Sequence, residues 1–283
     1  MNNFPDNLRF EIGIYVDEIV KWLTNNLGGF FDALKDGVMW FLLNMQTFLL
    51  WIPWYVVVLA VFIIGWRIKS WKSGLCYGIM IFLVGTFGLW NEMMITVAVM
   101  LTSVIISIVI GIPLGILMAY SSRLELIIKP MLDAMQTMPS FVYLIPAVYF
   151  FGLGTVPAVF ATIIYATPPV MRLTNLAIRR VPKEMKEAAN SFGSSRWQVL
   201  TKVELPQAFP TIMTGINQTT MMAMAMVVIS SMIGAKGLGE NVVTAMNRID
   251  IAMGFEAGIS IVFLAIIIDR ITQGIADRFK YAE

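Results

Sequence analysis

The sequence is poor in charge and contains no histidine. Only 13% of its 283 residues are charged, against roughly 25% in ordinary globular domains, whereas 58% are hydrophobic and the mean hydropathy is +0.76. A soluble protein cannot cover so much apolar surface with so few charges. The composition therefore excludes a soluble enzyme and a disordered chain, and predicts an all-α, polytopic membrane protein.

The missing residues also exclude several chemistries. Without histidine there can be no imidazole metal site, no Ser-His-Asp triad and no histidine proton relay. The single cysteine, Cys76, cannot form an internal disulfide, and its apolar neighbours predict a small buried hydrophobic residue. A net charge of +2 gives no reason to expect a nucleic-acid partner. The chain also lacks the Gly-x-x-x-x-Gly-Lys-Ser/Thr phosphate loop, so no cofactor is expected in it.

Seven stretches with few or no charges are candidates for membrane spans, because about 20 apolar residues cross the hydrocarbon core as a helix. They cover residues 48–66, 73–91, 93–122, about 139–152, about 157–178, 205–235 and 251–268. Residues 93–122 exceed one membrane thickness at about 1.5 Å per residue. That helix is therefore expected to tilt, to kink near Gly111–Pro113 or to project from the membrane. Residues 48–92 are predicted to form two peripheral spans and residues 93–276 the core.

The segment 1–47 has a different pattern, in which apolar residues recur at spacings of three and four. This apolar stripe consists of Leu8, Ile12, Tyr15, Ile19, Leu23 and Leu27. It predicts an amphipathic helix over residues 7–27, lying in the membrane interface or against another protein domain. Residues 30–43 stay apolar but carry Asp32, Lys35 and Asp36, which predicts a second interfacial or partly buried piece.

The distribution of Lys and Arg predicts the orientation, because cytoplasmic loops carry the excess of positive charge. If the basic segment 179–204 is cytoplasmic, alternation of the seven spans places 15 of the 20 Lys and Arg inside. Only five stay outside: Arg9, Lys21, Lys35, Lys236 and Arg248. We therefore expect the N-terminus outside the cell and the C-terminal tail, residues 277–283, in the cytoplasm.

The cytoplasmic segment 179–206 has the sequence of a helix-turn-helix. A helix, KEMKEAANSF, is expected to end at Gly193, which can adopt the left-handed conformation of a C-terminal cap. Ser195 and Gln198 have the spacing of a capping box for a second short helix, which Leu205–Pro206 is expected to end. This second helix is expected to present three apolar residues on one side: Trp197, Leu200 and Val203. Such a loop cannot cover its own apolar face, so it predicts a docking surface for another protein.

This loop resembles the EAA loop of bacterial ABC-importer permeases, whose pattern is EAA-x3-G-x9-I-x-LP. The matching residues are Glu187, Ala188, Ala189, Gly193, Val203, Leu205 and Pro206. Only the isoleucine position differs, and valine is a close substitute. The resemblance implies that the two alanines allow close approach to a separate ATPase subunit, that Glu187 is the polar contact and that Gly193 forms the turn. Residues 233–239 likewise look like the external loop after the next span of these permeases.

Two longer phrases are similar to the glycine betaine/proline betaine permeases of the osmoprotectant-uptake group. They are DAMQTMPSFVYLIPAVYFFGLG over residues 133–154 and IYATPPVMRLT over residues 164–174. The resemblance implies a type I, MetI-like ABC-importer transmembrane domain in a bacterial cell membrane, which translocates the solute and is not itself an enzyme. It also implies a homodimer, two ATPase subunits that bind ATP and an external substrate-binding protein. The alternatives are another ABC importer, such as one for methionine or another amino acid, and an osmotically gated channel.

Polar residues inside the 205–235 span are candidates for the translocation path: Asn217, Gln218, Thr219 and Thr220. Polar residues at this depth either line a cavity or bond to neighbouring helices, and the sequence leaves both interpretations open. Tyr143 could offer its ring to a quaternary ammonium group, although packing is the commoner role of such an aromatic residue.

Overall fold

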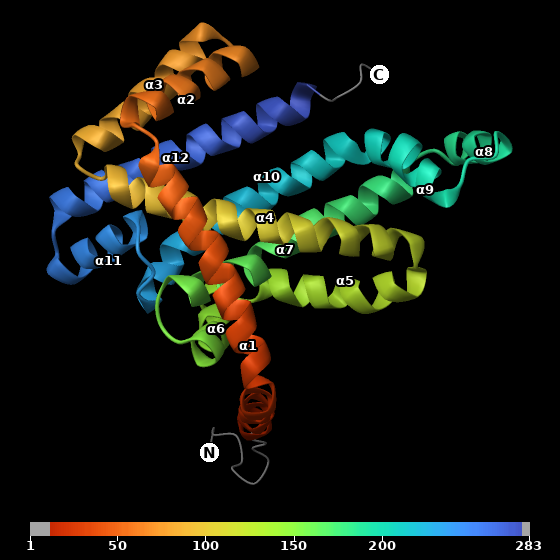
Figure 1. The fold of residues 1–283 in the computed structure, drawn as a ribbon, viewed down its shortest axis with the longest axis horizontal. Helices are drawn as coiled ribbons and strands as arrows, with labels where there is room; N and C mark the ends of the chain where they lie inside the picture. Colours follow the sequence, from red (N-terminus) through yellow and green to blue (C-terminus); the bar gives the residue numbers. More distant parts are fainter. Residues whose placement is uncertain (1–11, 279–283) are drawn as a thin grey trace, which may run out of the picture.

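The structure is a computed structural model that describes residues 12–278, and within this range every regular element is a helix (Figure 1). The α-helices are α1 (Ile12–Trp51), α2 (Trp54–Ile68), α3 (Trp71–Thr86), α4 (Trp90–Tyr120), α5 (Ser122–Thr137), α6 (Leu144–Phe151), α7 (Thr155–Arg180), α8 (Lys183–Ser191), α9 (Arg196–Val199), α10 (Leu205–Ile229), α11 (Leu238–Arg248) and α12 (Ile251–Arg278). Short helical pieces are η2 (Ser140–Tyr143), η3 (Leu200–Glu204) and η4 (Ser230–Ile233). The predicted all-α fold is confirmed. Leu8 and residues 279–283 lie outside the described range.

The centre of the molecule is formed by α7, which packs along both α4 and α10. Small residues allow this close packing: a Cβ atom added to Gly115 would lie 2.6 Å from the carbonyl oxygen of Met171. Figure 1 shows α5 and α12 running beside these three helices in roughly the same direction. Helices in a membrane associate through such small-residue contacts, because lipid gives no hydrophobic driving force between them.

The number of spans differs from the seven that the sequence predicted. Within residues 12–278, four helices are long and apolar enough to cross a membrane alone: Trp90–Tyr120, Thr155–Arg180, Arg196–Ile233 and Ile251–Asp277. Two bent helix pairs, α1 with α2 and α5 with the η2–α6 segment, raise the number to six at most. The remaining apolar helix, α3, has 16 residues and is therefore about 24 Å long. This is shorter than the roughly 30 Å hydrocarbon core, so residues 73–91 are not confirmed as a full span.

Two of the predicted spans do not form as single membrane-crossing helices. Residues 48–66 do not form one helix: α1 runs to Trp51, the chain bends by 94° and α2 begins at Trp54. Pro53 lacks a backbone N–H and disfavours helical geometry in the residue before it. The predicted short span at about 139–152 corresponds to the helical segment Ser140–Phe151, which has nearly the predicted bounds but is only about 18 Å long. It cannot cross the membrane alone, and it forms a pair with α5 that is bent by 112°.

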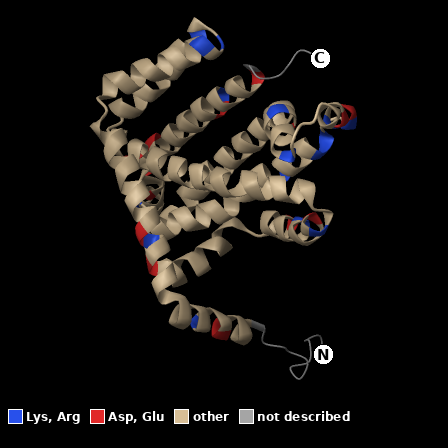
Figure 2. Cartoon of the chain, turned by 45° about the vertical axis from the view of Figure 1, so that its right-hand side comes forward, with Lys and Arg blue, Asp and Glu red and all other residues tan. Residues whose placement is uncertain are grey.

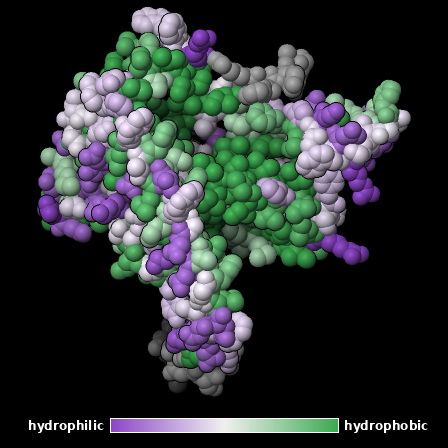
Figure 3. Space-filling view, in the orientation of Figure 1, coloured by the Kyte–Doolittle hydropathy of each residue, from purple (hydrophilic) through white to green (hydrophobic). Residues whose placement is uncertain are grey.

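The N-terminal helix α1 lies across the bundle instead of along it (Figure 1). A kink with non-helical backbone angles at Leu27 divides α1 into two helical parts, so the described residues of the two expected pieces, 7–27 and 30–43, lie on either side of the kink. Leu42 is buried in the main hydrophobic core, and the Phe31 ring stacks on Phe150 with 4.6 Å between the ring centroids. Figure 3 shows the outward side of α1 as a white and purple band beside the green apolar surface. The N-terminal helix therefore extends to residue 51, past the expected boundary at 47.

Charged residues gather mainly on α1 and at the ends of the bundle, while its middle is almost free of them (Figure 2). The turn between α2 and α3 lies beside the end of α12, because the side chain of Ile68 packs directly against Gly274 and fills the position of a Cβ atom there. Figure 1 places this turn toward the side that also carries α8 and α9. The alternation of seven spans, and with it the orientation of the termini, stays a prediction.

The prediction that Cys76 is buried is wrong. Its side chain is exposed on α3. In a membrane protein an apolar neighbourhood does not distinguish a residue that faces the core from one that faces lipid, because both environments are apolar.

Candidate functional site

The docking loop begins with α8, whose C-terminal turn is fixed by Gly193. This residue has φ of +78°, so the expected left-handed conformation is confirmed. Its N–H donates to the carbonyl oxygen of Asn190 (2.9 Å), and the N–H of Ser194 donates to that of Ala189 (3.1 Å). These two bonds form a Schellman motif. A Cβ atom at Gly193 would meet no other atom within 4 Å, so only the backbone conformation requires glycine here.

The second helix of the loop begins with the expected capping box. The Gln198 N–H donates to the Ser195 hydroxyl oxygen (3.3 Å), and the Ser195 N–H donates to Gln198 Oε1 (2.8 Å). The expected end at Leu205–Pro206 is wrong, because α9 continues through the π-helical turn η3 into α10. The Leu205 N–H donates to the carbonyl oxygen of Leu200, and Pro206 lies in the first turn of α10, where its missing N–H is tolerated.

The tip of the loop exposes a different apolar set from the one expected. Trp197 is 71% exposed, but Leu200 is buried beside Ala177 and Val203 is half-buried. The second exposed aromatic residue is Phe192, at 91% exposure, which the sequence analysis did not single out. Glu187 and Ala188 are exposed and Ala189 is half-buried, so the EAA residues lie on the accessible side of α8.

The base of the loop is held by Glu204, a carboxylate that is only 2% exposed. Its Oε1 atom lies 2.7 Å from the Lys186 ammonium of α8, which also donates to the carbonyl oxygen of Ile178 (3.2 Å). Its Oε2 atom accepts a hydrogen bond from the hydroxyl of Tyr120, the last residue of α4. One buried carboxylate therefore connects α8, α4 and the start of α10. In the sequence, the indication of this role was a single acidic residue, Glu204, between the motif positions Val203 and Leu205.

Three of the four predicted path residues on α10 face other helices. Asn217 donates to Asp269 Oδ1 of α12 (3.1 Å) and accepts from the Thr272 hydroxyl. The Thr220 hydroxyl donates to its own helix, at the carbonyl oxygen of Ile216 (2.8 Å), and Thr219 is fully buried. Of the four, only Gln218 is exposed. Whether these residues contact the solute stays a prediction.

Gln218 belongs to a set of exposed or partly exposed polar side chains on three neighbouring core helices. We call this set the polar face; it consists of Asp133 and Gln136 of α5, Arg172 of α7, and Thr214 and Gln218 of α10. Gly215 of α10 packs against the Val170 and Leu173 positions of α7, so these two helices are in contact at this level. An ion pair between Arg172 and Asp133 joins α7 to α5.

Tyr143 lies at the bend between α5 and α6 and is 6% exposed. Its hydroxyl donates to the carbonyl oxygen of Met135, and its ring lies 5.8 Å from the Tyr165 ring. In this conformation the side chain stabilises the bend. Its suggested contact with a quaternary ammonium group remains a prediction.

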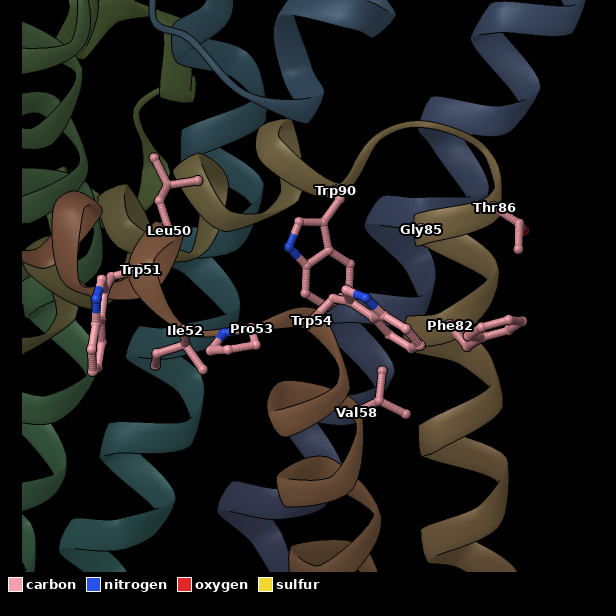
Figure 4. Close-up of a pocket in the computed structure, with 10 residues that line it drawn as sticks. All are labelled: Leu50, Trp51, Ile52, Pro53, Trp54, Val58, Phe82, Gly85, Thr86 and Trp90. Carbon is pink, nitrogen blue, oxygen red and sulfur yellow. The ribbon is translucent and has the colours of Figure 1, made fainter.

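A cavity of about 490 Å³ lies away from the docking loop, where the α1–α2 break meets α3 and α4 (Figure 4). Its lining residues carry no charge. Figure 4 shows the Trp54 and Trp90 rings close together with Phe82 beside them, whereas the Trp51 ring points away from that group. The cavity is therefore an aromatic and aliphatic space made by the break at Pro53, with no group suited to acid–base chemistry.

Comparison with known proteins identifies the family of this bundle and loop. Residues 111–281 match the family described as "binding-protein-dependent transport system inner membrane component". The chain belongs to that family. The permease is 49% identical over 287 residues to the glycine betaine/carnitine transport permease GbuB of Listeria monocytogenes, covering 99% of each chain. It is 44% identical over 272 residues to the glycine betaine permease OpuAB of Bacillus subtilis, covering 96% of each.

The solved structures support the same fold. The permease matches an inward-facing form of the MetNI methionine ABC transporter with a TM-score of 0.61 and 20% identity, over 66% of this chain and 93% of that chain. The expected MetI-like ABC-importer fold is thereby confirmed. The chain is a multi-pass membrane permease subunit and not an enzyme, and its family implies an ATPase subunit and a substrate-binding protein as partners. Amino-acid transport, kept as an alternative, finds no support in these betaine-permease relatives.

Proposed function

We propose that the permease takes up glycine betaine or a related quaternary-ammonium osmolyte, driven by ATP hydrolysis on a separate subunit. The observation that carries this proposal is the identity of 44% and 49%, over nearly the whole chain, to permeases named for glycine betaine. A third relative, the glycine betaine/proline betaine permease ProW of Escherichia coli, is 44% identical over 92% of this chain and 74% of its own length. A betaine has no net charge, which suits a core with few ionisable residues.

The docking loop supports coupling to an ATPase in preference to an autonomous channel. Glu187, Ala188, Phe192 and Trp197 are all exposed on one short helix-turn-helix. Aromatic residues that remain this exposed indicate an interaction surface. A channel that opens by itself has no need of such a surface. The ATP would be bound by the partner subunit, and none would be bound by this chain.

The assembly we propose contains two copies of the permease, two ATPase subunits and one kind of external substrate-binding protein. The polar face supports a second copy, because exposed polar side chains on membrane helices are expected to face water or protein in preference to lipid. We also propose a bacterial cell membrane, an external N-terminus and a cytoplasmic docking loop; the concentration of Lys and Arg in the segment 179–204 supports the cytoplasmic placement of the loop. The Gly-rich segment 233–239 then lies on the outer side, where a substrate-binding protein would dock.

The test is growth of a bacterium that lacks its own betaine uptake at high osmolality. Expression of the permease with its ATPase and substrate-binding protein should restore growth when glycine betaine is supplied, and omission of any one component should abolish the effect. Methionine uptake by a methionine-requiring strain serves as the comparison. Failure to rescue with all three components in the membrane, or rescue by the permease alone, would contradict the proposal.

A further inference from the structure

The ion pair of the polar face is partly exposed on two helices of the bundle. The side chains of Arg172 and Asp133 are 37% and 54% exposed; Arg172 belongs to α7, a candidate span by length and composition, and Asp133 to α5, which forms a candidate span only together with α6. Ionisable side chains in such segments face a water-filled cavity or another protein surface, because exposure to lipid is costly. The pair therefore borders the path or a second copy of the chain.

Arg172 also has a hydrogen-bond donor that is not used within the described residues. Its Nε atom is buried and has no hydrogen-bond partner among the described residues, and its only ion-pair partner there is Asp133. Arg179, two turns further along α7, has a different environment. It contacts Glu125 Oε2 (2.9 Å), Asn175 Oδ1 (3.0 Å) and the carbonyl oxygen of Met118 (2.8 Å). Arg179 thus connects α4, α5 and α7, whereas Arg172 has a single, half-exposed partner.

We propose that Arg172 and Asp133 together form a binding point for a zwitterionic solute in the translocation path. The guanidinium of Arg172 would hold the carboxylate of the solute by charge-assisted hydrogen bonds. The carboxylate of Asp133 would face its quaternary ammonium, which has no N–H to donate and is attracted by charge alone. One internal ion pair is exchanged for two pairs with the solute, so the site never holds a net charge.

The neighbouring side chains fit this role. Gln218 and Thr214 of α10 and Gln136 of α5 are exposed, uncharged polar groups on two helices that contact α7. A small zwitterion leaving the binding point would therefore exchange hydrogen bonds with polar residues and water. The inference rests on the proposed function, since it names the part of the permease that contacts the transported solute.

The experiment uses the complete transporter, permease with ATPase and substrate-binding protein, in liposomes with ATP on the ATPase side. Radiolabelled glycine betaine uptake, ATP hydrolysis and the melting temperature of the complex are measured for Arg172→Gln, Arg172→Lys and the neutral double variant Asp133→Asn/Arg172→Gln. We expect Arg172→Gln and the double variant to lose at least tenfold in uptake at nearly unchanged melting temperature. Arg172→Lys should retain intermediate uptake, because it keeps the positive charge.

Arg179→Gln is the matched control, because it removes the same charge from an arginine that connects three helices. It should lower the melting temperature while uptake per folded complex stays within twofold of the parent. The double variant is decisive: if it transports at the parental rate, the two charges only neutralise each other and the inference is overturned. If the parental complex hydrolyses ATP but takes up no betaine, the proposed function fails, and this inference fails with it.

Discussion

The Lys186 ammonium lies 2.7 Å from the buried carboxylate of Glu204, and this contact joins the docking helix α8 to the start of α10. The same carboxylate accepts the Tyr120 hydroxyl at the end of α4. Because α4 and α10 both pack on α7, this cluster connects α8 to the helices at the centre of the bundle. We therefore predict that the cluster transmits the movement of the ATPase.

Replacing Glu204 with Gln should weaken both stability and coupling. The substitution leaves the Lys186 ammonium without its ionic partner, and loss of one member of such a charge-assisted pair costs about 2 kcal/mol. We expect a melting temperature several degrees lower, and less betaine transported per ATP hydrolysed. Both quantities can be measured in the reconstituted complex.

The double variant Lys186→Met/Glu204→Gln provides the control for this prediction. It removes both charges and should recover part of the stability, because no uncompensated charge remains. Coupling should stay impaired, since the link between α8 and α10 is still missing. Parental coupling in Glu204→Gln would show that the cluster does not transmit movement.

Glu187→Ala should act on partner binding without affecting folding. The Glu187 side chain is exposed on α8 and lies in the EAA motif, so its removal leaves no buried group unpaired. We expect an unchanged melting temperature of the isolated permease, with weaker capture of the ATPase and slower transport. Glu184→Ala, on the same helix and also exposed, is the matched control and should behave like the parent. Equal ATPase capture by the parent, Glu187→Ala and Glu184→Ala would show that Glu187 is not part of the docking site.

Gly193→Val should strain the turn after α8 for a backbone reason alone. The φ of +78° is unfavourable for a β-branched residue, and the open space around the Cβ position excludes a steric clash as the cause. The expected cost is about 1–3 kcal/mol, with misdirection of the exposed tip and loss of ATPase capture. Gly193→Asn should be milder, because asparagine tolerates the left-handed region. Equal ATPase capture by the two variants would contradict this explanation.

The variants Asn217→Ala and Gln218→Ala should distinguish a residue that stabilises helix packing from an adjacent residue that affects transport. Asn217 bonds to Asp269 and Thr272 of α12, so its loss should cost about 1–2 kcal/mol and lower the melting temperature. Gln218 is exposed on the polar face, so its loss should leave the melting temperature unchanged and alter the uptake rate. The reverse pattern would place Asn217, and not Gln218, in the path.

Much of this fold could be predicted because the relevant signals are local. The Gly193 turn, the Ser195–Gln198 capping box and the spans around α4, α7 and α12 depend on residues close together in the sequence. The bend at Pro53 was missed because proline is common in membrane helices, where it is often tolerated. Pro113 is an example, since α4 continues through it.

The parts of the site that depend on distant contacts could not be predicted. Glu204 meets Lys186 and Tyr120 only after folding, and Asp133 is 39 residues from Arg172. The polar run from Asn217 to Thr220 gave no indication of which member faces outward, because burial is set by the positions of α7 and α12. Hydrophobicity also fails to distinguish the core from lipid, as the exposed Cys76 demonstrates.

The most direct test of the account measures radiolabelled glycine betaine in liposomes that contain the permease alone or with its ATPase and substrate-binding protein. We predict uphill accumulation only with all three proteins and ATP, and betaine-stimulated ATP hydrolysis under the same conditions. The permease alone should neither hydrolyse ATP nor accumulate betaine under an imposed Na⁺ or H⁺ gradient. Accumulation driven by an ion gradient through this chain alone would contradict the account.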